Sequence, residues 1–361
     1  MKIPATIFAR MQQVDYLITG QGISGSVLAM ELLSRGRSVA IIDSPEFSRS
    51  SHVAAGAFNP FNFRTMQNNW KADALAPLVR DFYRKCEQTL GAEFFHERKI
   101  FKILTGENEK RQWENACREK PGLFADPLIR ENPFASVIDA PYGMGVVNEA
   151  GNISTGIFLD SVKENVRAAG NYFTEKFEFG LLHVSENEIV YADTIRAKHI
   201  VFCMGFPGKD NPFFPSLPLR AVKGQTIHVH IPGLNCGEII NRGVYLLPLE
   251  KEYFVCGATF ENDRADEIPD EAGKQFLLSR LENFIRVPLR VESVFAGVRP
   301  AVKDRRPLAG TAQGKKNVAV FNGMGSKAVF LSPWLAKCLA DHFEKGDALP
   351  VEVDVNRFVT R

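Results

Sequence analysis

The sequence contains little that would place the protein in a membrane or on a nucleic acid. No apolar run among the 361 residues reaches the length of a membrane-spanning helix. The first residues carry Lys2 and Arg10 but no small-residue cleavage site, so they do not indicate a signal peptide, and Met11 competes with Met1 as the natural start. A formal net charge of only +2 gives no electrostatic surface for nucleic acid. We therefore expect no membrane span and no strong nucleic-acid signal.

Cysteine is also sparse, and its spacing is irregular. None of the six cysteines forms a C-x-x-C pair, so neither a zinc knuckle nor a redox dithiol is predicted, and we expect no metal site. Scattered thiols of this kind are typical of a reducing compartment, which leads us to expect a cytoplasmic protein whose cysteines are mostly small core residues.

What the sequence does have is an ordinary globular composition and an alternation of strand and helix at its start. Hydrophobic residues make up 45% and charged residues 24%, and the length suits two domains or one discontinuous domain. Apolar patterns predict strands at 14–19 and 39–42, with a helix at 23–35 between them. A polar loop over 44–69 and a helix over 70–90 follow.

Later segments repeat these helix and buried-strand patterns, with strand-rich stretches between them. Helices are predicted at 157–169 and 330–343, and a buried strand at 199–204. The strand-rich stretches are 93–104, 224–231, 243–248 and 253–258. We therefore predict an α/β fold, in which a Rossmann-like nucleotide-binding domain is assembled from separated segments and carries an inserted, mostly antiparallel β-sheet substrate domain. The predicted segments are 14–90, 150–215 and 295–361 for the first domain, and 91–149 and 216–294 for the second.

Three glycines interrupt the first strand–helix junction. Gly20 allows a tight turn, Gly22 lets the backbone approach a pyrophosphate, and Gly25 lets helix and strand pack closely, while the helix N-terminus holds the phosphate charge. Glycines at this spacing are common by chance, so the context decides. A strand precedes them, a helix follows, and the second strand ends in Asp43, whose carboxylate can accept both ribose hydroxyls. The pattern predicts a site for FAD or NAD rather than NADP.

A second glycine-rich turn, Gly323-Met324-Gly325-Ser326-Lys327, lies between a predicted strand and the last helix. A helix N-terminus at this place can stabilise a second anion or a developing negative charge. Reduced flavin carries such a charge, whereas an enzyme that uses only NAD has no need of this element. The turn therefore favours FAD over NAD, with an ordinary strand–turn–helix connection as the alternative.

Three separated motifs resemble the D-amino-acid oxidase superfamily of FAD-dependent oxidoreductases, which includes glycine oxidase and sarcosine oxidase. They are the N-terminal glycine turn with Asp43, the central "IVFCMG" that ends at Gly205, and a C-terminal G-x-R-P-x-x-x-D-x-x-P-x-x-G. The last motif is filled by Gly297, Arg299, Pro300, Asp304, Pro307 and Gly310. The segments "GMGSKA" and "AAGAFNPF", the latter containing Gly56, also resemble the oxidase half of the bacterial tRNA wobble-uridine methylaminomethyl enzyme. The likeness spans nearly the whole chain and implies an FAD-binding domain at the glycine turns.

The resemblance implies that Arg299 and Tyr245 bind the substrate. Arg299 matches the arginine that holds the substrate carboxylate, and a planar guanidinium fits a carboxylate through two hydrogen bonds. A structural ion pair with Asp304 or another acid is the alternative. Tyr245 matches a tyrosine of the inserted sheet that helps to hold the same carboxylate, with a core position as the alternative. Lys327 is expected beside the flavin pyrimidine ring or in solvent.

The resemblance is incomplete around the flavin. Ala328 stands where many relatives have glycine, and His52 is one position out of register with the histidine that carries covalent flavin in dimethylglycine dehydrogenase relatives. We therefore predict non-covalent FAD. The predicted cofactor-binding residues are Gly20, Gly22, Ser24, Gly25, Asp43, Gly56, Gly205, Gly323, Gly325, Ser326 and Lys327.

The predicted activity is oxidation of the C–N bond of a small amino acid or N-substituted glycine by hydride transfer to flavin, with a carboxylated small molecule as substrate. Oxygen or another acceptor then takes the electrons. The alternatives are an FAD-dependent 2-hydroxy acid or polyol-phosphate dehydrogenase, an NAD-linked dehydrogenase, and a flavoprotein linked to tRNA modification. Phe58, Phe61 and Phe63 could line an apolar pocket, but core packing is the favoured interpretation.

Overall fold

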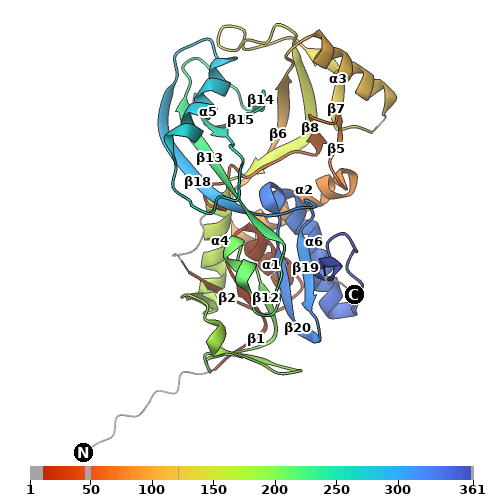
Figure 1. Cartoon of the computed structure of the whole chain (residues 1–361), viewed down its shortest axis with the longest axis vertical. Coiled ribbons are helices and arrows are strands. Elements are labelled where there is room, and N and C mark those ends of the chain that lie inside the picture. The colour runs from red at the N-terminus through yellow and green to blue at the C-terminus, as the bar shows by residue number, and fades with distance from the viewer. Residues whose placement is uncertain (1–10, 45–49, 121, 359–361) are drawn as a thin grey trace, which may run out of the picture.

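Two large sheets form the two halves of the molecule (Figure 1). The computed structural model describes residues 11–44, 50–120 and 122–358, so Met1, Lys2 and Arg10 lie outside the described residues. An 8-stranded sheet with helices packed on it makes the lower half of the view, and a 10-stranded sheet makes the upper half. The expected α/β fold class is confirmed.

The 8-stranded sheet is built around parallel strands that contain short buried apolar runs, such as "VAII" in β2 and "IVF" at the end of β12. β1 (Gln12–Thr19) lies between β2 (Val39–Asp43) and β12 (Ile195–Phe202), and β12 also pairs with β20 (Lys315–Asn322). This composition is typical of parallel strands buried on both faces, because every side chain then meets a packed layer. The edge strands are β9 (Tyr172–Thr174), β10 (Leu182–Val184) and β19 (Leu308–Ala312), and β11 (Ile189–Tyr191) lies between β10 and β12.

Four helices cover one face of this sheet. α1 (Ile23–Ser34) packs against α4 (Thr155–Ala168) and α6 (Ala328–Lys345), and α2 (Ala72–Leu90) packs on α6. Alternate side chains of the central strands enter this helical layer, and the intervening ones enter a second apolar cluster on the other face.

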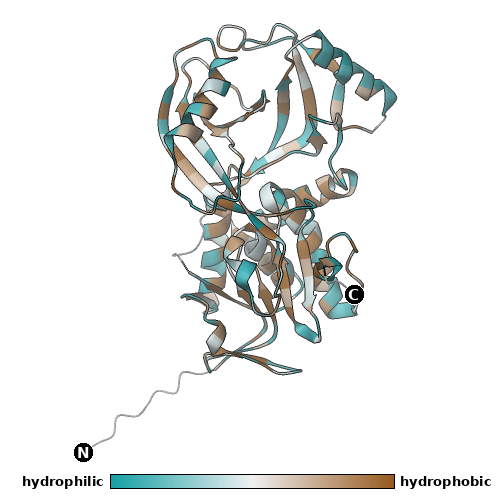
Figure 2. Cartoon of the chain, in the orientation of Figure 1, coloured by the Kyte–Doolittle hydropathy of each residue, from teal (hydrophilic) through white to brown (hydrophobic). Residues whose placement is uncertain are grey.

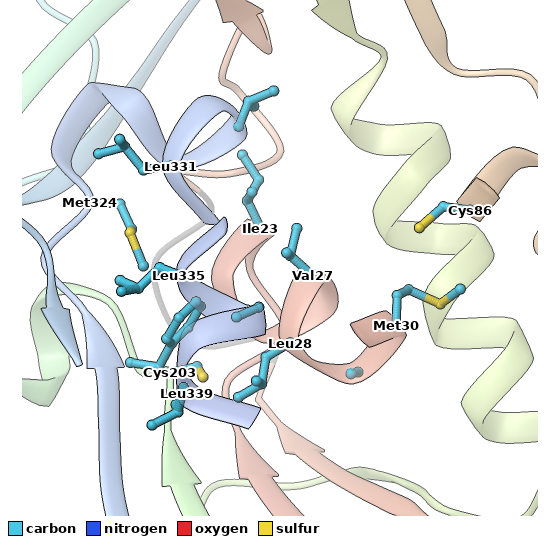
Figure 3. Packing of buried hydrophobic residues seen from close by; sticks show 14 of the residues in the cluster. Ile23, Val27, Leu28, Met30, Cys86, Cys203, Met324, Leu331, Leu335 and Leu339 are labelled. Carbon is cyan, nitrogen blue, oxygen red and sulfur yellow. The ribbon is translucent and has the colours of Figure 1, made fainter. Parts of the chain in front are cut away.

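The contact between α1 and α6 joins the two ends of the described chain. Val27 and Leu28 of α1 belong to the same buried cluster as Leu331 and Leu335 of α6 (Figure 3), and all four side chains are at most 3% exposed. Burying one such side chain contributes about 1.5–3 kcal/mol. The two helices whose N-termini follow the glycine-rich turns are therefore held against each other.

The 10-stranded sheet is mostly antiparallel, with one parallel pair between β6 and β14. Its strands are β3 (Ala57–Phe58), β6 (Phe95–Ile103), β7 (Ala125–Arg130), β8 (Met144–Ile153), β13 (Leu219–His230), β14 (Ile239–Asn241), β15 (Tyr245–Glu250), β16 (Tyr253–Gly257), β17 (Glu261–Asn262) and β18 (Arg290–Val302). Smaller elements beside the sheets are β4 (Phe61–Asn62), β5 (Gln67–Asn68), α3 (Glu107–Glu119), α5 (Glu271–Glu282), η1 (Phe179–Leu181), η2 (Phe206–Asp210), η3 (Gly325–Lys327) and η4 (Val355–Phe358).

A long antiparallel ribbon, β13 with β18, connects the two halves. Its pairing runs from Leu219 opposite Val302 to His230 opposite Arg290. The first of these pairs belongs to the apolar cluster beneath the parallel sheet, whereas Ile227, further along β13, belongs to the core of the 10-stranded sheet. In Figure 1 the ribbon crosses the waist of the molecule.

The predicted elements are present, and several others were missed. The region expected as a loop contains β3, β4 and β5, and the helix expected from residue 70 begins at Ala72. α3, α5 and β8 were not predicted, and the "FAGVRPAV" stretch, for which no element was predicted, is the end of β18. β18 also crosses the proposed domain boundary at 295, and the division into two domains stays a prediction.

The structure also shows the state of the cysteines and the character of the helices. All six cysteines are free thiols. Among the helices in the described part of the chain, none combines the length and apolar character needed to cross a bilayer.

Candidate functional site

A cavity of about 620 Å³ collects residues from both sheets. Its walls come from the β1–α1 turn, the end of β2, the loop at 50–59 and the end of β12 on one side. On the other side they come from β13, β15, β16 and β18, and the turn before α6 completes them. Segments from the two ends of the chain and its middle therefore meet around one space.

The β1–α1 turn is glycine-rich because its backbone approaches other backbone atoms. Gly20 has φ +95°, and a Cβ placed there would lie 2.6 Å from the carbonyl oxygen of Cys203. A Cβ at Gly25 would lie 2.0 Å from the carbonyl oxygen of Gly20, so this position packs the helix on the turn and does not line the cavity. Side chains at either position would push the helix away from the sheet.

The N-terminus of α1 opens into the cavity. Gly22 is the N-cap and supplies no side-chain cap, and Gly22, Ile23 and Ser24 all line the space. The Ile23 N–H donates to Ser51 Oγ at 3.1 Å, while the first helical turn keeps the partial positive charge of its backbone dipoles. This end of the helix can hold a phosphate group.

Asp43 lies where β2 ends and faces the same cavity. Its Oδ1 accepts a hydrogen bond from the Gln21 N–H at 2.8 Å, and its Oδ2 lies 3.5 Å from the Tyr172 hydroxyl. Burial raises the pKa of the Asp43 carboxyl above its ordinary value. The carboxylate keeps lone pairs that can accept ribose hydroxyls.

Arg299 projects from β18 into the cavity without an acidic partner. Its Nη1 donates to the Thr259 carbonyl at 3.1 Å, and its guanidinium carbon lies 4.4 Å from the centroid of the Phe260 ring. Within residues 11–44, 50–120 and 122–358 no carboxylate forms an ion pair with it; Asp304, the suggested partner, instead pairs with Arg357 at 3.0 Å. Burial lowers the pKa of Arg299 below its ordinary value. Most of its N–H donors remain available to an anion.

Tyr245 begins β15 and lines the same part of the cavity as Arg299. Burial raises the pKa of its phenol, and the positive charge of Arg299 acts on it in the opposite direction. The hydroxyl therefore stays protonated at neutral pH and can donate a hydrogen bond beside the guanidinium.

The turn before α6 enters the cavity only in part. Gly325 and Ser326 line it, whereas Gly323 packs against Val302, and Lys327 does not line it. The Lys327 amine instead donates to Asn69 Oδ1 at 3.3 Å. The expected place of Lys327 beside the flavin thus receives no support from the cavity geometry and stays a prediction.

The remaining residues of the predicted set divide in the same way. Gly56 and Gly205 line the cavity, and the Gly205 carbonyl accepts a hydrogen bond from Asn322 Nδ2 at 2.7 Å. His52 is exposed and does not line the cavity. Phe58 and Phe63 line it, while Phe61 packs in the core against Trp113.

Several cavity residues were not found from the sequence. They are Gln21, Ser51, Asn241, Gly224, Thr226, Gly257, Phe260 and Phe276. Most lie on β13, β16 or the segments that follow them, and only the pairing of distant strands brings them to the site. Ser51 sits in the predicted polar loop, where nothing marked it against its neighbours.

The chain belongs to the DAO family, described as FAD dependent oxidoreductase, which it matches over residues 15–342. FAD is its cofactor, and the protein is an oxidoreductase enzyme. The cavity fits FAD. Close-packed glycines at positions 20 and 25 leave room for a pyrophosphate at the N-terminus of α1, and Asp43 offers acceptors for a ribose. The buried Oγ1 of Thr19, which also lines the cavity, has no hydrogen-bond partner among the described residues.

Individual relatives are distant but cover most of the chain. The bifunctional protein ThiO/ThiG of Nostoc sp. is 24% identical over 91% of this chain and 52% of its own length. The chain therefore spans about half of that relative. Glycine oxidase of Bacillus subtilis is 22% identical over 91% of this chain and 92% of its own length. The crystal structure of glycine oxidase from Geobacillus kaustophilus has a TM-score of 0.74 at 19% identity, covering 93% of this chain and 96% of that one, and shows the same fold.

Proposed function

We propose that the protein oxidises the C–N bond of a small amino acid or an N-substituted glycine. The observation that supports this most directly is Arg299, a partly buried guanidinium that faces the cavity with no acid paired to it among the described residues. A cation in this setting is stabilised when an anion binds, because its charge is otherwise poorly solvated. The carboxylate of an amino acid is such an anion. The names of the relatives, glycine oxidase among them, agree with this substrate class.

The proposed FAD site uses the parallel-sheet side of the cavity. Gly20, Gly22 and Ser24 would hold the pyrophosphate at α1, and Asp43 would hold the ribose of the adenosine. Gly56, Gly205, Gly325 and Ser326 would contact the rest of the group from the loops around it. The exposed position of His52 supports non-covalent attachment. FAD bound in this way supplies the acceptor for a hydride.

Arg299 and Tyr245 would bind and orient the substrate. The guanidinium accommodates both oxygens of a carboxylate in its plane, and the protonated Tyr245 hydroxyl donates a further hydrogen bond to it. A carboxylate held at two points fixes the neighbouring carbon and its C–H bond in one orientation, which lowers the entropic part of the barrier. The 6%-exposed Thr226 adds a hydroxyl without a partner among the described residues to the same wall.

The charged residues of the cavity also limit the mechanism. In the described part of its lining, the only carboxylic acids are Asp43, at the end of β2, and Glu175, just after β9, and neither lies beside Arg299. No carboxylate is therefore placed to take a proton from a substrate amine at the Arg299 end. The amine has to bind in its neutral form, with the nitrogen lone pair free to form the C=N bond as the hydride leaves carbon. Water then hydrolyses the imine.

The walls beyond Arg299 favour an apolar group on the substrate. Phe260 and Phe276 line the cavity although they are 64% and 42% exposed, so they stand at its mouth. Phe63 and Ile100 add apolar surface. Covering exposed aromatic rings is favourable by about 25 cal/mol per Å² of apolar surface. A polyol phosphate fits less well, since Arg299 is the single cationic side chain in the described lining.

Anaerobic mixing of the FAD-loaded protein with separate panels of amino acids, N-alkyl glycines and 2-hydroxy acids tests the proposal. Loss of the oxidised-flavin absorbance with the amines, and not with the hydroxy acids, is the expected result. If only the hydroxy acids bleach the flavin, the substrate is a 2-hydroxy acid and the proposed amine substrate is wrong. Inertness to both panels, together with retardation of tRNA at low salt, would favour the role in tRNA modification. The cytoplasmic location and the terminal electron acceptor stay predictions.

A further inference from the structure

Two strand glycines lie directly beneath the proposed substrate-binding side chains. We infer that Gly224 and Gly257 are positioning residues, which leave room for Arg299 and Tyr245 to lie across the sheet toward the cavity. The inference rests on the proposed function of these two side chains. It adds the residues that determine where the guanidinium and the phenol can be.

Gly224 clears the space that the guanidinium occupies. Gly224 lies on β13 opposite Gly297 of β18, and Arg299 is opposite Val222, so the arginine is its diagonal neighbour on one face of the ribbon. A Cβ added at Gly224 would lie 2.1 Å from Nη2 and 2.3 Å from both Cζ and Nη1 of Arg299. These distances are far inside van der Waals contact, so a methyl group and this guanidinium position exclude each other.

Gly257 has the same relation to the phenol. It lies on β16 directly opposite Tyr245 of β15, with Thr226 of β13 on its other side. A Cβ added at Gly257 would lie 2.6 Å from the Tyr245 hydroxyl oxygen and 2.8 Å from its Cζ. The ring therefore lies over the bare backbone of the neighbouring strand, and both glycines line the cavity.

A left-handed backbone conformation does not explain these two glycines. Neither has the positive φ found at Gly20 and many turn glycines, so the strain of a left-handed residue does not account for them. What an alanine cannot do is share space with the side chain above it. The cost of substitution falls on side chains that line the cavity: on Arg299 for Gly224, and on Tyr245 together with the Thr226 methyl group, 2.8 Å from the added Cβ, for Gly257.

Gly145 and Gly237 provide matched controls. A Cβ at Gly145 on β8 would lie 2.6 Å from the Trp113 ring, an equally severe clash in the same sheet but outside the cavity lining. A Cβ at Gly237 would meet nothing within 4 Å. Gly145→Ala is expected to lower the melting temperature without changing ligand affinity, and Gly237→Ala to change neither.

The test measures binding of propionate to the FAD-loaded protein through the change in flavin absorbance. Propionate carries the carboxylate but no amine, so turnover does not interfere. We expect Gly224→Ala and Gly257→Ala each to weaken propionate binding by about tenfold or more, with flavin content retained. Wild-type protein that does not bind propionate would remove both the proposed function and this inference. Wild-type binding that both alanine variants retain would remove the inference alone.

A double-mutant cycle separates positioning from general damage. In an Arg299→Ala background the methyl group at 224 has free space, so Gly224→Ala should produce no further loss of affinity. If Gly224→Ala alone fails to fold, Arg299→Ala should restore folding of the double variant. A loss of affinity or stability that persists unchanged in the Arg299→Ala background would overturn the inference.

Discussion

Replacing Arg299 with methionine is expected to separate substrate recognition from stability. Methionine keeps much of the length of the side chain and removes its charge and donors. Because Arg299 has no acid paired to it in the described structure, its removal should leave no buried charge behind. The variant should lose carboxylate recognition while the fold is retained or strengthened.

The expected magnitudes follow from the contacts. Truncating one partner of a buried, hydrogen-bonded charge pair costs about 2–5 kcal/mol. Arg299 stands near the exposed Phe260 at the cavity mouth, so the lower part of this range applies, about 2–3 kcal/mol, or a loss of about 30- to 160-fold in kcat/KM. The variant loses the stabilising hydrogen bond from Arg299 to Thr259 but no longer has to bury a charged guanidinium. These two contributions oppose each other, so we expect the free energy of unfolding to change by about 1 kcal/mol or less.

The assay compares an amino-acid substrate with the corresponding amine that lacks the carboxylate. The rate of flavin reduction by the acid should fall, while the rate with the decarboxylated amine should not, so the ratio between them collapses. Arg357→Met is the matched control. Arg357 is 11% exposed and bonded to Asp304, to the Asp354 carbonyl and to the Arg306 carbonyl. This control should lose about 1–3 kcal/mol of stability and keep the ratio.

Two results would refute the reasoning. An unchanged ratio between acid and amine in Arg299→Met would show that the carboxylate binds elsewhere. A loss of stability in Arg299→Met as large as in Arg357→Met would show that Arg299 is a structural cation, contrary to its lack of an acidic partner.

Three further predictions concern the cofactor and acid stability. Gly25→Ala places a methyl group 2.0 Å from the Gly20 carbonyl oxygen and should lower both the melting temperature and the FAD content of the purified protein, and normal values for both would contradict the packing argument. Asp43→Asn should weaken FAD binding by about tenfold or more in equilibrium dialysis, since the amide replaces one acceptor oxygen with a donor nitrogen and removes the negative charge, and an unchanged affinity would reject the ribose role. His199 stacks on Tyr16, and burial lowers its pKa from 6.5 to about 4, so the unfolded chain takes up a proton first as the pH falls. Stability should therefore be complete above pH 6.5 and decrease toward pH 4, and His199→Phe should flatten this part of the stability curve measured by urea unfolding.

The parallel half of the fold was predictable because its signals are local. The strand of β2 reads as a continuous apolar run, and Gly20 and Gly25 mark a junction whose close approach is fixed within a few residues. α3 gave no such signal, because only Trp113 and Ala116 of its residues are buried and most of the helix is hydrophilic (Figure 2). Two buried residues form too narrow an apolar face for the helix to be recognised from the sequence, without knowledge of the surface it packs on.

The substrate end of the site was only partly predictable for a different reason. Arg299 and Tyr245 stood out through a family resemblance, and both line the cavity. Gly224 and Gly257 carried no signal, since their importance depends on strand register, which no short stretch of sequence encodes. The role of Lys327 stays a prediction, because its neighbours Gly325 and Ser326 line the cavity while its own amine donates to Asn69.

The ribbon of β13 and β18 has a mechanical consequence. Residues of this ribbon are buried in the cores of both sheets, so β13 and β18 cannot slide along each other without breaking all the hydrogen bonds between them at once. Arg299 lies on this ribbon, so the position of its guanidinium depends on how the ribbon packs against the parallel sheet. A chimera that replaces the 10-stranded sheet with that of another protein would have to keep both strands of the ribbon. Otherwise Arg299 would be separated from the 8-stranded sheet that fixes its position.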